Sequence, residues 1–252
     1  MKIVAVTQAR TGSTRLPEKV LKMVDGISLL ELHLRRVSGS KMINELIVAT
    51  TVNPEDDPII HIAGNLGLRS YRGSVNDVLD RFYQALQGSA ADFVVRLTSD
   101  CPLIDPQLVD KVIQRCIDQG LDYCSNVLDP HYPDGQDVEV FRFSALEKAW
   151  KEATLTSERE HVTPFIWKNS SYKGGSLFKS DNFQENYSFG HLRMTVDEQK
   201  DLDVIRKVIE TLGIDRSWLE YANYLESNEG VKKLNETITR NEGYNKSISK
   251  EK

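Results

Sequence analysis

The alternation of apolar strand-like runs with amphipathic helices constrains this chain more than any other feature of its sequence. Residues 2–8 (KIVAVTQ), 45–51 (ELIVATT) and 92–100 (DFVVRLTSD) are β-branched apolar runs of the length expected for buried parallel strands. Apolar residues recur at helical spacing between these runs, and capping signals at Ser28 and Asn53 mark the helix starts. Such repeated βα units predict a parallel sheet that is covered by helices on both sides.

The pattern changes after about residue 122, where shorter strand-like runs and a turn-rich loop replace the regular βα units. We interpret residues 122–190 as an insertion that completes the same sheet. We therefore expect one domain over residues 1–227, followed over 228–252 by a C-terminal helix and a polar, partly disordered tail. The remaining expected elements are helices near 76–86, 105–117, 144–153, 157–168 and 202–212, and strands near 138–143, 172–180 and 191–197.

Composition excludes several classes of protein. A hydrophobic fraction of 40% over 252 residues supplies a real core. The formal net charge of −5 argues against a general nucleic-acid binder, which usually needs excess cations. No apolar run approaches the roughly 18 residues of a membrane span, and the chain enters its first strand without a signal peptide. The three cysteines show no C-x-x-C spacing, so neither disulfides nor zinc are indicated, and we expect a cytoplasmic protein with no nucleic-acid or membrane partner.

The loop after the first strand concentrates cations and small residues. Arg10, Arg15 and Lys19 flank Gly12 and Ser13 at the carboxyl end of a strand, where open α/β sheets bind ligands. The loop matches neither the G-x-x-x-x-G-K-[ST] pattern nor G-x-G-x-x-G, which disfavours P-loop ATPases and nicotinamide dehydrogenases. Its backbone N–H groups and three cations suit the oxygens of a phosphate chain. The alternative is a solvated surface turn.

Two acidic residues also stand at expected strand ends. Asp100 closes the run RLTSD, and Asp197 closes RMTVD before a helix. Mg²⁺ bound to a nucleotide usually takes one or two protein carboxylates together with phosphate oxygens, so this pair predicts a metal site beside the basic loop. The alternatives are a turn hydrogen bond for Asp100 and a helix N-cap for Asp197. For Asp105 we expect helix capping alone.

Six stretches stand out in order along the chain: QARTGSTRLPEKVL, TTVNPEDDPI, YRGSVNDVLDRFYQA, VVRLTSDCPLIDP, PDGQDVEVF and SEREHVTPFI. Together they closely resemble the family of spore-coat polysaccharide biosynthesis protein F, from residue 1 to about 212. This family is a branch of the cytidylyltransferases that also includes CMP-Kdo synthetase and acylneuraminate cytidylyltransferase. The resemblance implies a nucleotide-diphospho-sugar transferase-like fold, a three-layer α/β/α sandwich with a mostly parallel central sheet.

The resemblance also implies an activity: Mg²⁺-dependent transfer of CMP from CTP to a small acidic acceptor such as a sugar acid, with release of pyrophosphate. It further implies surface polysaccharide biosynthesis as the setting and a possible homodimer. The chain departs from the family loop R-x-x-S-x-R-L-P-G-K at Glu18, where Gly is usual, and from relatives at Ser99, where Gly is frequent. An acidic side chain beside a triphosphate repels it unless that side chain points outward.

The residue roles implied by the resemblance fall into three groups. Asp100 and Asp197 are the metal carboxylates, and Arg10, Arg15, Lys19 and Asp100 are the catalytic group. The nucleotide-binding residues are Gln8, Ala9, Arg10, Gly12, Ser13, Arg15, Lys19, Gly73, Ser74, Asp77 and Arg81. The expected acceptor-binding residues are Asp137, Glu139, Arg159 and His161.

Two other functions stay open at this point. A glycosyltransferase of the same fold uses a nucleotide-sugar and a D-x-D metal motif, and the DLD of residues 201–203 falls inside an expected helix instead of at a strand end. A non-catalytic nucleotide-binding assembly protein is expected to have lost basic loop residues or one carboxylate, and this chain retains both.

Overall fold

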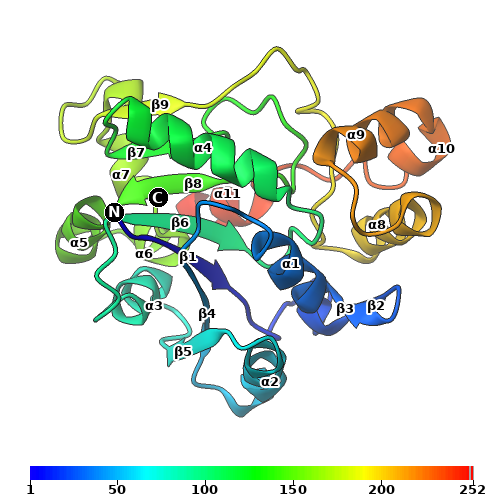
Figure 1. Cartoon of the computed structure of the whole chain (residues 1–252), viewed down its shortest axis with the longest axis horizontal. Helices are drawn as coiled ribbons and strands as arrows, with labels where there is room; N and C mark the ends of the chain where they lie inside the picture. Colours follow the sequence, from blue (N-terminus) through cyan, green and yellow to red (C-terminus); the bar gives the residue numbers. More distant parts are fainter. Residues whose placement is uncertain (250, 252) are drawn as a thin grey trace.

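The computed structural model describes residues 1–249 and 251, and its centre is a sheet of seven strands (Figure 1). The strand order is β5-β4-β1-β6-β8-β7-β9. The strands are β1 (Ile3–Gln8), β4 (Glu45–Thr51), β5 (Arg69–Gly73), β6 (Phe93–Thr98), β7 (Tyr123–Ser125), β8 (Glu139–Arg142) and β9 (Ser180–Asn182), and a separate hairpin joins β2 (Met23–Val24) to β3 (Ile27–Ser28).

The half of the sheet from β5 to β6 is parallel throughout, as the βα pattern predicts. The strand β8 then runs antiparallel to both β6 and β7, and β9 returns to a parallel pairing with β7. The register aligns Arg96 of β6 with Glu139 of β8. Because β8 runs backwards, the residues that precede it lie just beyond the carboxyl end of β6, on the edge where β1 and β4 also end.

Helices cover both faces of the sheet, because the inner strands of the sheet carry apolar residues on both sides. In β1, Ile3 and Ala5 belong to one hydrophobic cluster and Val4 and Val6 to the other. The first cluster is covered by α1 (Leu29–Val37), α2 (Asp57–Asn65), α4 (Pro106–Asp118), α8 (Gln199–Leu212) and α9 (Trp218–Ser227), and the second by α3 (Val78–Ala85), α5 (Phe143–Glu152), α6 (Thr156–His161) and α7 (Pro164–Lys168). The expected three-layer α/β/α sandwich is confirmed.

Several boundaries in the second half differ from the sequence-based expectation. Residues 191–197 form no strand; they are an extended segment with one bridge between Arg193 and Asp134, and Val196 N–H donates to the Asp100 carbonyl. The expected strand near 172–180 is a 3-10 turn, Ser171–Lys173, followed by β9. Gly174 lies between them with a φ of 81°, which favours a turn over an extended strand.

The expected helix over 157–168 is two helices, α6 and α7. Val162 separates them with a φ of 72°, which is rare for a β-branched residue, and Pro164 opens α7. A proline cannot donate the backbone hydrogen bond of a helix interior, so the chain starts a new helix there. The helix α9 was not predicted, although Ser217 and Glu220 form its capping box, a signal readable in the sequence.

The C-terminal stretch, for which we expect a helix and a polar, partly disordered tail, contains two short helices in the residues that the structure describes. After α10 (Glu229–Lys232), residues 242–249 form α11 (Glu242–Ser249), whose Ser247 is buried. Figure 1 shows α11 (red) across the middle of the molecule, apart from α8, α9 and α10 (orange). Residues 250 and 252, which the expectation also covered, lie outside the described residues. None of the helices described is long and apolar enough to cross a membrane.

Candidate active site

The basic loop that follows β1 is anchored by a buried aspartate. Asp56 is 2% exposed, and its Oδ1 accepts hydrogen bonds from the backbone N–H (2.7 Å) and hydroxyl (2.8 Å) of Thr11. Its Oδ2 accepts from Thr51 at the end of β4. Burial raises the pKa of Asp56, but these donors outweigh it and the pKa is lowered, so the carboxylate stays charged. Asp56 therefore ties the loop to the end of the neighbouring strand.

The loop then turns around Thr11, whose carbonyl accepts from the N–H groups of Ser13 and Glu18. Glu18 has a φ of 54°, in the left-handed region that favours glycine. The family's glycine at this position thus matches a backbone requirement, and the chain places a strained glutamate there instead. The Glu18 side chain is exposed to solvent.

Lys19, at the end of the loop, brings the two predicted carboxylates together. Its Nζ lies 2.9 Å from Asp100 Oδ2 and 2.7 Å from Asp197 Oδ1. Asp100 follows β6, and Asp197 follows the extended segment 191–197, so three distant parts of the sequence meet at this ammonium. The side chain of Lys19 is only 14% exposed. The convergence that the strand ends predict is therefore present.

The charges in this cluster support one another. Burial by itself lowers the pKa of Lys19, but the two aspartates reverse this and raise it. Burial likewise raises the pKa of Asp100, and the Lys19 ammonium overcomes that and holds it well below its usual range. At neutral pH Lys19 is thus an ammonium and Asp100 a carboxylate.

Asp197 is held from its other side by Arg193. The Arg193 guanidinium is nearly buried and contacts Asp197 (2.9 Å), Asp134 (2.6 Å) and Asp201 (2.9 Å). Asp201 is fully buried and accepts from the backbone N–H groups of Asp197 and Glu198. The DLD of residues 201–203 is thus used inside the fold, which removes it as the D-x-D metal motif of a glycosyltransferase.

The other loop cations differ in how they are used. Arg15 contacts Asp197 at 3.1 Å and Glu242 of α11 at 2.8 Å. Arg10 is exposed and has no ion pair among residues 1–249 and 251. Gln8 and Ala9 end β1 next to it; the Ala9 N–H bonds to β4, and the buried Gln8 Oε1 has no hydrogen-bond partner in the described part of the chain. Gly12 is exposed and Ser13 half-buried.

The expected nucleoside-binding residues gather where β5 meets α3. Ser74 accepts the Asp77 N–H with its hydroxyl and Arg81 Nη1 with its carbonyl. A Cβ on Gly73 would lie 3.1 Å from Arg81 Cγ, so glycine permits this close packing. Arg81 is 2% exposed, and burial followed by the nearby charge of Arg10 lowers its pKa to about 10. A buried guanidinium thus lies close to the basic loop.

The four expected acceptor-binding residues are not brought together as one open group. Arg159 forms a bidentate pair with Asp77, with Nη2 at 2.5 Å, and Asp77 also caps α3. The Glu139 carboxylate is buried and bonds Arg96, Tyr123 and Thr163. Arg159 and Glu139 are therefore engaged within the fold.

The other two expected acceptor residues contact the C-terminal segment. Asp137 Oδ1 bonds Arg240 Nη2 at 2.6 Å, and His161 Nε2 lies 3.1 Å from the Ser247 hydroxyl. Burial, followed by the charge of Arg96, lowers the pKa of His161 to about 4, so its ring is neutral at pH 7. Burial, with Glu139 and Asp100 nearby, raises the pKa of Asp137 despite the pairing with Arg240. Asp137 thus lies near the charge of Asp100, and His161 is the last residue of α6.

Several polar residues that the sequence reading did not assign shape this site. The buried His33 joins Thr7 Oγ1 of β1 (3.0 Å) to the Cys101 carbonyl (2.9 Å), directly under the Asp100 turn. Arg193, Asp56 and Arg240 have the positioning contacts described above. No local pattern in the sequence singles these residues out, because most of their partners lie more than 40 residues away. The exceptions are Thr7 for His33, Asp197 and Asp201 for Arg193, and Thr51 for Asp56.

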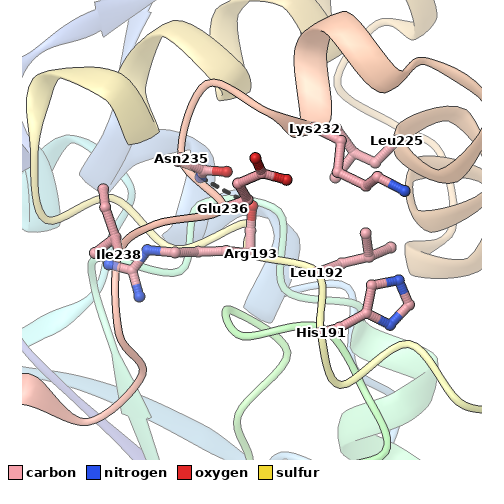
Figure 2. Close-up of a pocket in the computed structure, with 8 residues that line it drawn as sticks. All are labelled: His191, Leu192, Arg193, Leu225, Lys232, Asn235, Glu236 and Ile238. Carbon is pink, nitrogen blue, oxygen red and sulfur yellow. Dashed lines mark hydrogen bonds between the residues drawn. The ribbon is translucent and has the colours of Figure 1, made fainter.

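A small cavity lies beside the Arg193 backbone, lined by Leu192 and Asn235 among others (Figure 2). Its volume is about 30 Å³, room for roughly one water, and Asn235 closes it by donating to the Arg193 carbonyl at 3.3 Å. Figure 2 shows His191, Lys232 and Glu236 around it. The cavity is too small for a nucleotide, so the candidate active site is defined by the carboxyl edge of the sheet.

The donor set around Lys19 fits a divalent cation. Asp100 and Asp197 already converge on one positive charge, and both are charged carboxylates, which Mg²⁺ prefers. Residues 1–249 and 251 contain no group of three His, Cys, Asp or Glu residues suited to a metal. A bound Mg²⁺ would therefore need phosphate oxygens as further ligands, and Lys19 would have to turn toward those phosphates.

The fold matches solved structures of the nucleotidyltransferase type. A cytidylyltransferase from Leptospira borgpetersenii superposes with a TM-score of 0.87 at 31% identity, over 95% of this chain and 100% of that chain. The structure of CMP:2-keto-3-deoxy-manno-octonic acid synthetase complexed with CTP superposes with a TM-score of 0.64 at 18% identity, over 84% and 99%. At that identity the second match shows the shared fold alone.

Sequence comparisons agree with the structural match. The spore coat polysaccharide biosynthesis protein SpsF of Bacillus subtilis is 30% identical over 225 residues, which cover 84% of this chain and 88% of that protein. The family model described as Cytidylyltransferase matches residues 4–242, nearly the whole chain. On these grounds the chain belongs to the cytidylyltransferase family.

Proposed function

We propose that the protein transfers CMP from CTP to a small acidic acceptor, a sugar acid or a related compound, and releases pyrophosphate. The observation that carries this proposal is the Lys19 ammonium between Asp100 and Asp197, at the end of a loop with two further cations. Membership of the cytidylyltransferase family supports CTP as the donor, and similarity to the spore coat protein supports a place in polysaccharide biosynthesis.

In this reaction an acceptor oxygen attacks the α-phosphorus of CTP in line with the departing pyrophosphate. The new O–P bond forms as the bond to the bridging oxygen breaks, and the acceptor hydroxyl loses its proton to water. Positioning and charge neutralisation are expected to supply most of the catalysis. Arg10, Arg15 and Lys19 neutralise the departing phosphates, and the backbone N–H groups around Gly12 line the same loop.

Asp100 and Asp197 are the residues that would hold Mg²⁺. When bound, the ion supplies charge neutralisation at the phosphates and lowers the pKa of an attacking hydroxyl. Arg193 keeps the Asp197 carboxylate in place through its 2.9 Å contact, and Asp56 keeps the loop against β4 through Thr11. The buried Arg81, beside Ser74, faces the nucleoside side of the site.

On the acceptor side, Asp137 and His161 are the better candidates, because their partners come from the C-terminal segment and not from the core. Glu139 and Arg159 act indirectly, by supporting β8 and α3. Binding of the acceptor by this group and a homodimeric state both stay predictions.

A pyrophosphate-release assay with each of the four ribonucleoside triphosphates, with and without Mg²⁺ and a pool of sugar acids, tests the proposal. We expect release with CTP only when Mg²⁺ and an acceptor are present, and mass spectrometry should detect a CMP conjugate. A nucleotide-sugar consumed in place of CTP would indicate the glycosyltransferase alternative. Binding of CTP with no turnover across the acceptor pool would favour the non-catalytic one.

A further inference from the structure

The C-terminal residues 240–249 and 251, here called the strap, contact the candidate active site. At one end Arg240 contacts Asp137 at 2.6 Å, and Glu242 Oε2 contacts Arg15 Nη1 of the basic loop at 2.8 Å. The cytidylyltransferase match ends at residue 242, so nearly all of α11 lies beyond the matched region. The strap is therefore an addition to the matched region that reaches back to its anion-binding loop.

The other end of the strap is fixed to α6. The Ser247 hydroxyl donates to Glu160 Oε2 at 2.7 Å and lies 3.1 Å from His161 Nε2. The Glu251 carboxylate accepts hydrogen bonds from the backbone N–H (2.5 Å) and hydroxyl (3.0 Å) of Ser157. Four side chains of the strap thus bond residues of the loop, the acceptor side and α6.

Two buried polar atoms of the strap have no hydrogen-bond partner in the described part of the chain. The Tyr244 ring lies against His161 (5.2 Å between centroids) and Trp167 (6.0 Å), but its buried Oη has no hydrogen-bond partner in the described part of the chain. The buried Nε of Arg240 also has no hydrogen-bond partner among the described residues. Burying an unpaired polar group costs free energy, so this closed arrangement is less stable than its contacts alone imply.

Arg15 shows why the strap and an anionic ligand compete. Its guanidinium is shared among Asp197, Glu198 at 3.7 Å and Glu242. A polyphosphate on Arg15 would meet the Glu242 carboxylate at close range, and like charges repel. A ligand shifts a two-state equilibrium only by its difference in affinity for the two states, and this repulsion supplies such a difference.

We propose that the strap is a latch that is released by the triphosphate: Glu242 occupies Arg15 in the empty protein, and nucleotide binding displaces the strap and opens the acceptor side. The proposal rests on the proposed function for the identity of the nucleotide. Because coupling between two sites is reciprocal, loosening the strap must tighten nucleotide binding by the same factor.

Hydrogen exchange of residues 241–249 in the full-length protein measures the latch directly. Glu242→Gln removes the contact with Arg15 and the i,i+4 pair with Lys246. Glu229→Gln on α10 is the matched control, because it also removes pairs with nearby lysines, but Glu229 pairs only with Lys232 and Lys233 among residues 1–249 and 251. We expect about two- to fivefold faster exchange in Glu242→Gln without ligand, the size of an exposed ion pair, and no change in the control.

The effect of ligands on the exchange of residues 241–249 then tests the proposal. Inorganic tripolyphosphate and CTP, each with Mg²⁺, should speed exchange of residues 241–249 in the wild type, and CTP should bind Glu242→Gln about two- to fivefold more tightly by calorimetry. Unchanged or slower exchange with tripolyphosphate overturns the latch, whatever CTP does, and so does equal or weaker CTP binding to Glu242→Gln. If CTP binds neither protein, the proposed function fails, while the tripolyphosphate experiment still tests the latch.

Discussion

The two halves of the sheet use their polar residues differently. After the parallel strand β6, Asp100 meets Lys19 of the basic loop together with Asp197 of the non-strand segment 191–197, and Arg10 is left without an ion pair among the described residues. In the half that contains β8, Glu139 and Arg159 are each bonded by several groups of the fold. Charged residues near a sheet edge can therefore form a binding site only where other residues of the fold do not already occupy their hydrogen-bonding groups.

Sheet direction is the cause of this difference. The parallel strands β1, β4 and β6 all end at one edge of the sheet. The strand β8 starts at that edge, so Glu139 is already inside the sheet, opposite Arg96. Only residues before the strand, such as Asp137, extend toward the site.

The largest effect is expected from Lys19→Gln. Asp100 and Asp197 lose the charge that separates them and repel each other, and a triphosphate loses its innermost cation. We expect pyrophosphate release from CTP to fall on the order of a hundredfold or more. The exposed Lys41→Gln serves as the control, which should keep wild-type activity. Activity within threefold of wild type in Lys19→Gln would break the assignment of the site to the parallel half.

Glu139→Gln should act on stability. Removing one charge of the buried pair leaves Arg96 uncompensated, which costs about 3–5 kcal/mol of unfolding free energy. A denaturant titration measures the change in unfolding free energy. Glu147→Gln is the control: Glu147 is half-exposed and paired to Lys151, so this variant should lose less than about 1 kcal/mol. The comparison would break if Glu139→Gln kept its stability and raised only the KM for the acceptor.

His33→Gln should flatten the pH dependence of stability. Burial lowers the pKa of His33 from 6.5 to about 4. Between these two pH values the unfolded chain therefore binds a proton at His33 that the folded protein does not bind. The wild type should therefore lose up to about 3 kcal/mol from this residue as the pH falls from 6.5 to 4. Unfolding curves at both pH values should show a smaller loss in the variant; equal losses would contradict the prediction.

The smallest effect is expected from Glu18→Gly. Glycine removes the strain of the positive φ at this position, but it also raises the conformational entropy of the unfolded chain, which lowers stability. We expect a net gain of about 0.5 kcal/mol in unfolding free energy. Glu18→Ala removes the same charge and keeps a Cβ, so it should not gain stability. Thermal melts of the two variants separate strain from charge, and equal melting temperatures would assign the effect to charge alone.

The sequence by itself determined the fold class and the central pair of carboxylates. Hydrophobic periodicity and capping residues are local, so the strands at 2–8, 45–51 and 92–100 and the helices between them were readable. The position of Asp100 at a strand end was enough to predict that it lies at the carboxyl edge, because all parallel strands end there.

Only the tertiary structure decided which charged residues stay available. That Arg159 pairs with Asp77, that Asp56 holds the basic loop, and that Arg15 contacts Glu242 all depend on partners 45 to 227 residues apart. A linear pattern records residue type and spacing but not which opposite charge comes within hydrogen-bonding distance. The contacts of the strap were not predicted for the same reason: its composition is polar, and its partners lie in α6 and the basic loop.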